Sequence, residues 1–292
     1  MQPLSLFCKS YLPDLQRARS LVESVRKFNR DRIRLYLSVP QKDLAAFKNN
    51  MGVEGVEWVT DEDIASTVGP KNLTRLTQTP GHLAQQVVKS EFWRLRLSES
   101  YFCLDSDCLF IRPFGASDFL APDATPYTVL HEGKPLRQFC RAHALTHEIQ
   151  NFDAEKNAAL KIFGRTGVIY NFGPLPVVWS ANVWASLDEN FLQPRGMCLF
   201  DAIQLHPSEA TWYGEALMKY RAIQLYPREP FFRAYLYLEE YIQDRAAGIG
   251  TETLAADYMG IVYQSNWYPK RLRPVKRLAY TIKKVMRRFG LR

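Results

Sequence analysis

The sequence predicts an α/β protein in which a mostly parallel sheet is covered by helices. Short apolar runs, each about the length of one strand, alternate with segments whose apolar residues recur every three or four positions. This alternation is typical of parallel strands joined by right-handed helical crossovers. The run at residues 101–111 is apolar on both sides of two aspartates, so we expect a strand that is covered on both faces.

The first part of the chain supplies the strands and helices that precede this run. Polar residues 68–80, with Gly69 and two prolines, are expected to form a loop over a ligand pocket. Ligands of such sheets sit at the carboxyl ends of the strands, so Lys9, Asp61 and the aspartates at 105 and 107 are expected in one pocket. We expect strands at residues 4–8, 34–39 and 56–59, and helices at residues 13–28, 43–50 and 83–97.

The second part of the chain continues the pattern with shorter apolar runs. Residues 135–163 have helical periodicity and carry two histidines, which are more often surface or packing residues than ligands. We expect strands at residues 127–130, 176–180, 223–226 and 258–263, and helices at residues 135–163, around residues 184–187 and at residues 235–246.

Asp105 and Asp107 are two positions apart in the predicted strand, so their side chains are expected to point the same way, with Ser106 opposite. Two carboxylates so close to buried apolar residues need a proton or a cation, and a divalent cation shared with a diphosphate is the usual solution. The pattern alone is weak because residues 61–63 repeat it, where helix capping is the favoured role. The apolar context favours metal binding at Asp105 and Asp107 over a solvated strand end.

These motifs resemble those of GT-A glycosyltransferases, which use nucleotide sugars. A helix with the run QQVVK at residues 85–89 precedes the LDSD run. The resemblance covers residues 4–268 and is closer to a bacterial family of poorly characterised glycosyltransferase-like proteins. It implies a Rossmann-like GT-A fold, Mn²⁺ or Mg²⁺, and transfer of a sugar from a nucleoside diphosphate donor to a hydroxyl of a lipid-linked bacterial surface glycan. The runs that carry the closer resemblance are FCKSY, FWRL, LDSD and GIVYQSN, at residues 7–11, 92–95, 104–107 and 260–266.

The resemblance also implies roles for particular residues. Asp107, with Asp105, would hold the metal, and Asp105 would otherwise hold the ribose or a metal-bound water. Metal-dependent GT-A enzymes often complete the site with a late histidine, but the last histidine here is His206, so Gln264, Asn266 or Lys270 would have to serve. From the residues alone, Lys89 is equally well explained as a solvated charge on a helix or as a contact to nucleotide or phosphate. The resemblance favours the contact. The candidates for nucleotide or phosphate binding are Lys9, Ser10, Asp61, Gln86, Lys89, Asp105 and Ser106.

A carboxylate beside two aromatic residues marks the start of a later predicted helix. Ser208 can cap this helix, and Glu209, Trp212 and Tyr213 are spaced so that they share one face. The arrangement suits the binding of an acceptor sugar and equally suits a packed helix. If the reaction inverts the anomeric centre, Glu209 is the first candidate for the base and Asp153 the second. Retention requires no such base, and the sequence leaves both outcomes open.

The composition is that of an ordinary soluble protein, with 47% hydrophobic and 23% charged residues. No apolar run approaches the roughly 18 residues of a transmembrane helix, and we expect no signal peptide at the N-terminus. The five cysteines lack zinc-site spacing and are expected to be reduced thiols in the cytosol. No Gly-x-Gly-x-x-Gly or Walker motif indicates dinucleotide or P-loop chemistry.

Residues 269–292 differ from the remainder of the chain. They hold ten Lys or Arg and no Asp or Glu, whereas residues 1–268 hold 28 basic and 30 acidic residues. Apolar residues recur every three or four positions between the charges, which predicts a basic amphipathic helix that contacts an anionic membrane through residues 270–292. The alternative is a helix docked on the body. We expect a glycosyltransferase domain at residues 1–268, no nucleic-acid partner, and a peripheral location on the inner face of the cytoplasmic membrane.

Two other function classes share parts of this pattern. A nucleotidyltransferase would also use the Asp-x-Asp metal site, but it would usually have a glycine-rich basic loop after the first strand, and residues 9–13 contain no glycine. A non-catalytic peripheral membrane module would explain the basic tail but not the aspartate pair. Donor hydrolysis with and without EDTA separates the three classes.

Overall fold

A computed structural model gives the fold of the chain and describes residues 1–52 and 54–264. The central sheet has five strands in the order β3-β2-β1-β4-β7. Neighbouring strands among the first four are parallel, and β7 runs antiparallel to β4. The predicted α/β class with a mostly parallel sheet is therefore confirmed. The strands are β1 (Gln2–Lys9), β2 (Leu35–Val39), β3 (Glu57–Thr60), β4 (Ser98–Asp105) and β7 (Val177–Ser180).

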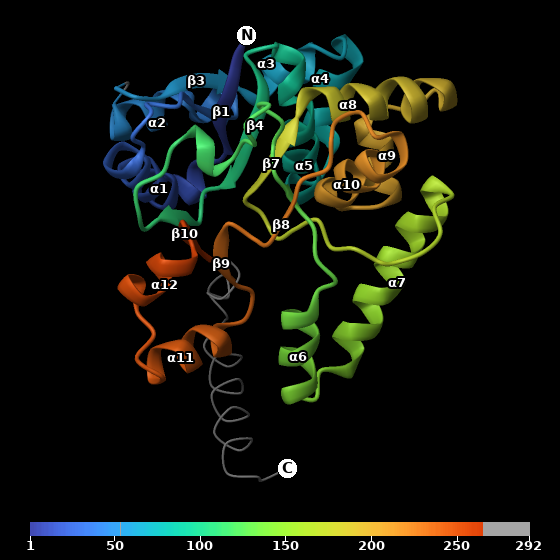
Figure 1. Cartoon of the computed structure of the whole chain (residues 1–292). Helices are drawn as coiled ribbons and strands as arrows, with labels where there is room; N and C mark the ends of the chain where they lie inside the picture. The colour runs from blue at the N-terminus through green and yellow to red at the C-terminus, as the bar shows by residue number, and fades with distance from the viewer. Residues whose placement is uncertain (53, 265–292) are drawn as a thin grey trace, which may run out of the picture.

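Helices cover both faces of this sheet, because β2 and β3 are added on one side of β1 and β4 on the other, and right-handed crossovers in opposite directions lie on opposite faces. Figure 1 shows α1 and α2 on one side, and α5, α8 and α10 on the other. The burial pattern of α1 repeats at helical spacing, because Leu21, Val22 and Val25 face the core. The helices around the sheet are α1 (Leu15–Phe28), α2 (Leu44–Met51), α3 (Asp61–Ser66), α4 (Pro70–Gln78), α5 (Gly81–Glu91), α8 (Ala181–Leu187), α9 (Leu199–Leu205) and α10 (Glu209–Tyr220).

A second sheet of three strands continues the core beyond β4. Its order is β5-β10-β9, formed by Cys108–Phe110, Gly260–Tyr263 and Phe232–Tyr235. A Cβ at Gly260 would lie 2.1 Å from the ring of Phe232, so only glycine allows this close approach of β10 to β9. The Phe102 ring on β4 packs against Phe232 and Phe110 and so joins the two sheets into one core.

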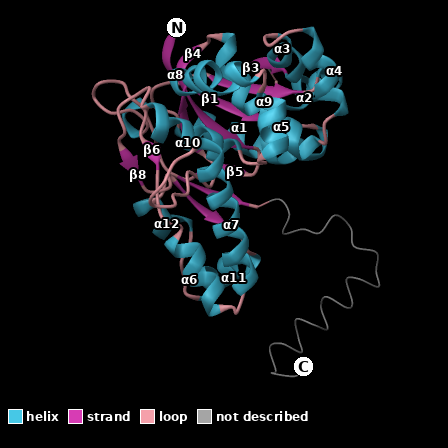
Figure 2. Cartoon of the chain, turned by 90° about the vertical axis from the view of Figure 1, so that its right-hand side faces the viewer, coloured by secondary structure: helices cyan, strands magenta, loops and turns pink. Residues whose placement is uncertain are grey.

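Four further helices lie beyond one end of the main sheet, as Figures 1 and 2 show from two directions. They are α6 (Lys134–Ala142), α7 (Thr146–Phe163), α11 (Leu238–Ala246) and α12 (Thr251–Asp257). The short strands β6 (Thr128–Val129) and β8 (Pro227–Arg228) pair in parallel near them. No helix within the described ranges has the length and apolarity needed to span a membrane.

The structure corrects several predicted elements. Residues 68–80 are not a loop, because Pro70 occupies the first turn of α4 and fits that position without a backbone donor. The run at residues 101–111 is not one strand, since β4 ends at Asp105 and β5 begins in the other sheet. Residues 223–226 are not a strand, and residues 235–246 combine the end of β9 with α11. The helix predicted at residues 135–163 is divided at Ala144, which has a positive φ of 56°.

Candidate functional site

The carboxyl ends of the parallel strands bring several predicted site residues to one edge of the sheet. Lys9 ends β1 and is in register with Asp105, which ends β4. On its other side, Lys9 is in register with Ser38 near the end of β2. Asp61 follows β3 directly, as the first residue of α3. The sheet therefore places Lys9, Asp61 and Asp105 at one edge, as their positions at strand ends predicted.

Lys9 and Asp61 form an ion pair at this edge. Lys9 Nζ lies 2.9 Å from Asp61 Oδ2, and Ser38 Oγ donates to Asp61 Oδ1 at 2.7 Å. Burial raises the pKa of Asp61 above its ordinary value, although the charge of Lys9 and the hydrogen bond from Ser38 oppose this rise. The hydroxyl of neighbouring Ser10 is buried and has no hydrogen-bond partner among the described residues. The capping role expected in residues 61–63 belongs to Asp63, which forms a capping box with Thr60.

Lys89 lies between two carboxylates that are far apart in the sequence. Its Nζ is 2.5 Å from Asp105 Oδ1 and 3.3 Å from Glu209 Oε1. The Lys89 side chain is only 3% exposed, so the alternative of a solvated helix charge is wrong. Burial alone would lower the pKa of Lys89, but the charges of Asp105 and Glu209 outweigh it and raise that pKa well above its ordinary value. Lys89 is therefore a permanent cation at neutral pH.

Asp105 and Asp107 do not lie on one face of a continuous strand. Ser106 and Asp107 form the turn between β4 and β5, so the strict alternation predicted for the three residues is wrong. Ser106 Oγ donates to Asp14 Oδ2 at 3.4 Å rather than facing the opposite side of a sheet. The Asp105 side chain is 32% exposed, which leaves this carboxylate accessible from solvent.

The end of β10 approaches this turn from the late part of the chain. The backbone N–H of Tyr263 donates to the carbonyl oxygen of Asp107 at 3.1 Å. Gln264 follows directly, so β10 carries this predicted late ligand to the Asp107 turn. The other predicted late residues, Asn266 and Lys270, lie outside the described residues.

The donor set at this turn suits a hard divalent cation that shares a ligand. Within residues 1–52 and 54–264, no three His, Cys, Asp or Glu side chains are grouped to hold a metal by themselves. Asp105 and Asp107 would supply carboxylate oxygens, and Mg²⁺ in proteins is often held by one or two carboxylates together with substrate phosphates. The residues thus fit a metal whose remaining ligands come from a diphosphate.

Glu209 is the first residue of α10, and this helix is capped as the sequence predicted. The N–H of Thr211 donates to Ser208 Oγ at 3.3 Å. Lys156, a buried lysine on α7, donates to Thr211 Oγ1 at 2.8 Å and so ties α7 to the first turn of α10. Sequence reasoning missed Lys156, although its spacing from the buried residues Ala159, Leu160 and Phe163 already placed it on the apolar face of α7.

The two aromatic residues next to Glu209 are packing residues and do not form an acceptor platform. Trp212 is 1% exposed, packs against Phe163, and donates through Nε1 to the carbonyl of His206. Tyr213 is 2% exposed and accepts a hydrogen bond from the N–H of Ser180 at its hydroxyl. The spacing allowed either an acceptor-binding face or a packed helix, and the structure supports the packed helix.

Asp153 and Gln86 have contacts of their own. Asp153 on α7 accepts two hydrogen bonds from Arg137 on α6, and these bonds lower its pKa below the ordinary value. No described contact joins Asp153 to Lys89. Gln86 lies one turn before Lys89 on α5 and donates through Nε2 to the carbonyl of His82, while its Oε1 is buried and has no partner among the described residues.

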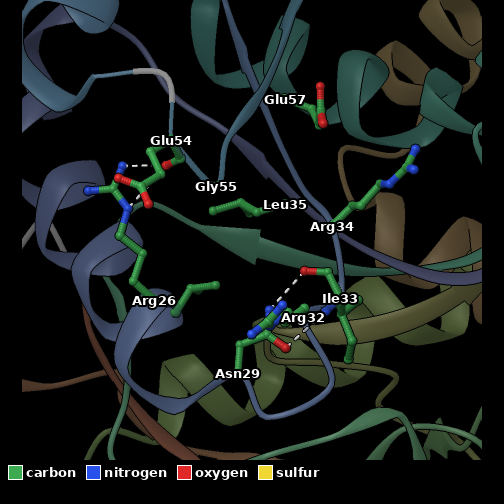
Figure 3. Close-up of a pocket in the computed structure, with 10 residues that line it drawn as sticks. Arg26, Asn29, Arg32, Ile33, Arg34, Leu35, Glu54, Gly55 and Glu57 are labelled. Atoms are coloured by element: carbon green, nitrogen blue, oxygen red, sulfur yellow. Dashed lines mark hydrogen bonds between the residues drawn. The ribbon is translucent and has the colours of Figure 1, made fainter.

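A cavity of about 460 Å³ lies at the opposite edge of the sheet, away from these residues. It is bounded by the end of α1 and by Leu35 and Glu57, which begin β2 and β3. Figure 3 shows Arg26 turned toward Glu54 and Arg34 directed away from Arg32. Because this cavity adjoins the amino ends of the strands, it is separate from the cluster around Lys89.

Comparisons with known proteins identify a family and a similar solved structure. The structure of mouse xyloside xylosyltransferase 1 in its apo form is similar at a TM-score of 0.46 and 9% sequence identity, covering 90% of this chain and 98% of that one. A likeness at this level indicates nothing about donor, acceptor or metal. No curated protein matches the sequence. The model of a family of unknown function, DUF6492, matches residues 2–190, and the chain belongs to that family.

Proposed function

We propose that this chain is a GT-A glycosyltransferase that moves a sugar from a nucleoside diphosphate donor to a hydroxyl of a glycan. The observation that carries the proposal is the meeting of Asp105, Lys89 and Glu209 at the carboxyl edge of the parallel strands, beside the Asp107 turn. In open α/β sheets this edge is where ligands bind. The Asp-Ser-Asp run and its resemblance to GT-A enzymes support the choice of reaction.

Different residues at this edge would bind different parts of the donor. Asp107 and Asp105 would hold Mn²⁺ or Mg²⁺, which when bound offsets the negative charge of the leaving diphosphate. Lys89 would contribute a fixed positive charge to the same region. Lys9, Asp61 and Ser10 would line the nucleotide side, where the unpartnered Ser10 hydroxyl is available for a ligand hydrogen bond.

Glu209 is our candidate for the base if the reaction inverts the anomeric centre. Its Oε1 accepts a hydrogen bond from Lys89, so Oε2 would take the acceptor proton. Asp153 ranks second, because it is already paired with Arg137. Under retention neither carboxylate acts as a base.

The acceptor and the location are proposed from the sequence of the basic tail. Residues 269–292 lie outside the described residues, and their charge pattern favours contact with anionic lipid. We therefore propose a lipid-linked bacterial surface glycan as the acceptor, reached from the inner face of the cytoplasmic membrane.

Donor hydrolysis tests the proposed reaction class. The purified chain is incubated with a panel of uridine, guanosine, cytidine and thymidine diphosphate sugars and Mn²⁺, and release of the nucleoside diphosphate is measured with and without EDTA. We expect hydrolysis of at least one donor, and its loss in EDTA. Release of pyrophosphate from nucleoside triphosphates would instead identify a nucleotidyltransferase. Absence of both reactions, and of nucleotide binding, would contradict an enzymatic role.

A further inference from the structure

The ammonium of Lys89 occupies the space between two acidic side chains where a cation is required. Asp105 Oδ1 and Glu209 Oε1 both lie within 3.3 Å of Lys89 Nζ. One of these carboxylates, Asp105, is also a proposed ligand of the divalent metal. If the metal binds as proposed, this carboxylate would be shared between the Lys89 ammonium and the metal ion.

Lys89 is fixed in this position by the fold. Its side chain is 3% exposed, and the hydroxyl of Tyr101 donates to its backbone carbonyl at 2.8 Å. The neighbouring residues Val88 and Ser90 on α5 are buried as well. The ammonium is buried beside Asp105, so a second cation bound by Asp105 would lie close to it.

We propose that Lys89 makes metal binding depend on the nucleotide: its charge disfavours a divalent ion at Asp105 in the free protein, so the ion binds together with the diphosphate. This inference rests on the proposed function. A metal at Asp105 would lie close to a like charge in a partly buried site, where such repulsion is strong. The diphosphate adds negative charge and oxygen ligands, which attract the ion more strongly than Lys89 repels it. Ion and nucleotide therefore favour each other's binding, and by linkage the coupling is equal in both directions.

Binding of Mn²⁺ alone, followed by electron paramagnetic resonance of the free ion, tests this role without relying on activity. The intact chain is titrated with Mn²⁺ in the absence and presence of saturating nucleoside diphosphate, chosen from UDP, GDP, CDP and TDP by thermal shift. We expect the Kd for Mn²⁺ to fall at least about tenfold with nucleotide, given the size of one buried like-charge interaction. An equal Kd with and without nucleotide in a protein that binds both would overturn the proposal.

The variant Lys89→Met removes the ammonium and keeps a long apolar side chain. We expect it to bind Mn²⁺ alone about ten- to hundredfold more tightly than the unchanged protein and to show less coupling to nucleotide. Lys156→Met is the matched control, because it removes another buried lysine that contacts Thr211 rather than Asp105 or Glu209. A Kd for Mn²⁺ that stays within about twofold in folded Lys89→Met would contradict the proposal.

A second variant guards against loss of folding. Lys89→Met leaves Asp105 and Glu209 close together without a cation, so Lys89→Met with Glu209→Gln removes one of the two negative charges. We expect this double variant to bind Mn²⁺ alone more tightly than the unchanged protein, and equal or weaker binding would count against the proposal. Failure of the proposed function has a different signature: no nucleoside diphosphate binds even with Mn²⁺, while the effect of Lys89 on Mn²⁺ alone is still measured.

Discussion

Lys9 and Asp61 form an ion pair across β2, because Lys9 ends β1 and Asp61 follows β3 on the other side of that strand. The pair lies at the carboxyl edge, and Ser38 at the end of the intervening strand completes it with a hydrogen bond to Asp61. The three strand ends are thus joined by side chains as well as by the sheet. If the proposed donor binds here, its nucleotide would replace or extend these contacts.

Replacement of Asp107 tests the metal assignment. Asp107→Asn removes a ligand charge with little change in volume, so we expect donor hydrolysis to be abolished while the Tm stays within a few degrees of the unchanged protein. Hydrolysis is measured in buffer with limiting Mn²⁺, together with thermal unfolding. Asp63→Asn is a control in the other Asp-x-Asp run, because Asp63 caps α3 together with Thr60. Near-normal turnover of Asp107→Asn at limiting metal would show that Asp107 is not a ligand.

Replacement of Glu209 tests the candidate base. If Glu209 takes the acceptor proton, Glu209→Gln is expected to lower the transfer rate by roughly 10²–10⁴-fold with little change in nucleotide affinity. The measurement is kcat for transfer to a glycan acceptor, alongside the Kd of the nucleoside diphosphate.

Glu215→Gln is a matched control for Glu209→Gln on the same helix. Glu215 is buried on α10 and bonded to Arg165, at 2.6 Å and 2.9 Å, so its replacement perturbs a buried ion pair away from Lys89. We expect a lower Tm for Glu215→Gln and an unchanged kcat. An unchanged kcat for Glu209→Gln would assign the base to another residue or indicate retention.

The sequence predicted most of the strands because their apolar runs are continuous and bounded by polar residues. It did not predict that β4 ends at Asp105, since the apolar residues beyond the turn, Cys108 and Phe110, are buried in a second sheet. A run of apolar residues reports burial and carries no information about which sheet buries it. The same limit applies to α10, where periodicity could not distinguish Trp212 in a core from Trp212 in a binding site.

The candidate site could be predicted residue by residue but not as a cluster. Lys89, Asp105 and Glu209 were each candidates, yet their meeting at one ammonium joins residues 120 positions apart, which only tertiary packing determines. The pairing of Lys9 with Asp61 had a weak signal, since both follow strand ends. Lys156 had a signal that was overlooked, because a lysine on the apolar face of a helix is expected to have a buried partner.

Removal of the basic tail tests the proposed membrane contact. A chain that ends at Trp267 lacks all ten basic residues of the tail, and each lysine or arginine near an anionic surface contributes about 1 kcal/mol of attraction. We expect the shortened protein to stay soluble, to keep donor hydrolysis, and to lose binding to phosphatidylglycerol vesicles in a flotation assay. High salt should also weaken binding of the full chain. If the full chain does not bind anionic vesicles at low salt, the proposed membrane contact is wrong. If the shortened chain unfolds, the tail belongs to the core.

Substitution of Gly214 tests how α10 is held in place. A Cβ at Gly214 would lie 2.0 Å from the Phe172 ring, so Gly214→Ala should destabilise the protein by about 1–3 kcal/mol through overpacking, despite the higher helix propensity of alanine. Gly81→Ala at the start of α5 is the control, because its Cβ would meet no atom within 4 Å. Denaturant unfolding of both variants measures the effect. Equal stability of the two variants would mean that Phe172 moves aside at little cost.

The pH dependence of stability tests the buried carboxyl group of Glu91. Burial raises the pKa of Glu91 from 4.5 to about 7, although Arg94, bonded to it at 2.5 Å, opposes the rise. The folded protein therefore holds this proton over a pH range in which the unfolded chain has lost it. The protonated Glu91 therefore adds to the free energy of unfolding below pH 4.5. This contribution of about 3 kcal/mol is lost as the pH rises through 7.

Glu91→Gln removes this titration and keeps a neutral side chain of the same shape. Arg94 retains its ion pair with Asp188 at 3.0 Å in the variant, so the network is not left without a carboxylate. Thermal unfolding is measured from pH 5 to pH 8 for both proteins, and we expect the Tm of the unchanged protein to fall relative to that of Glu91→Gln as the pH rises. Because the two proteins differ only at residue 91, the difference between their Tm curves reports the effect of Glu91. Parallel Tm curves across this range would show that Glu91 is already ionised in the folded protein at pH 5, and that Arg94 outweighs its burial.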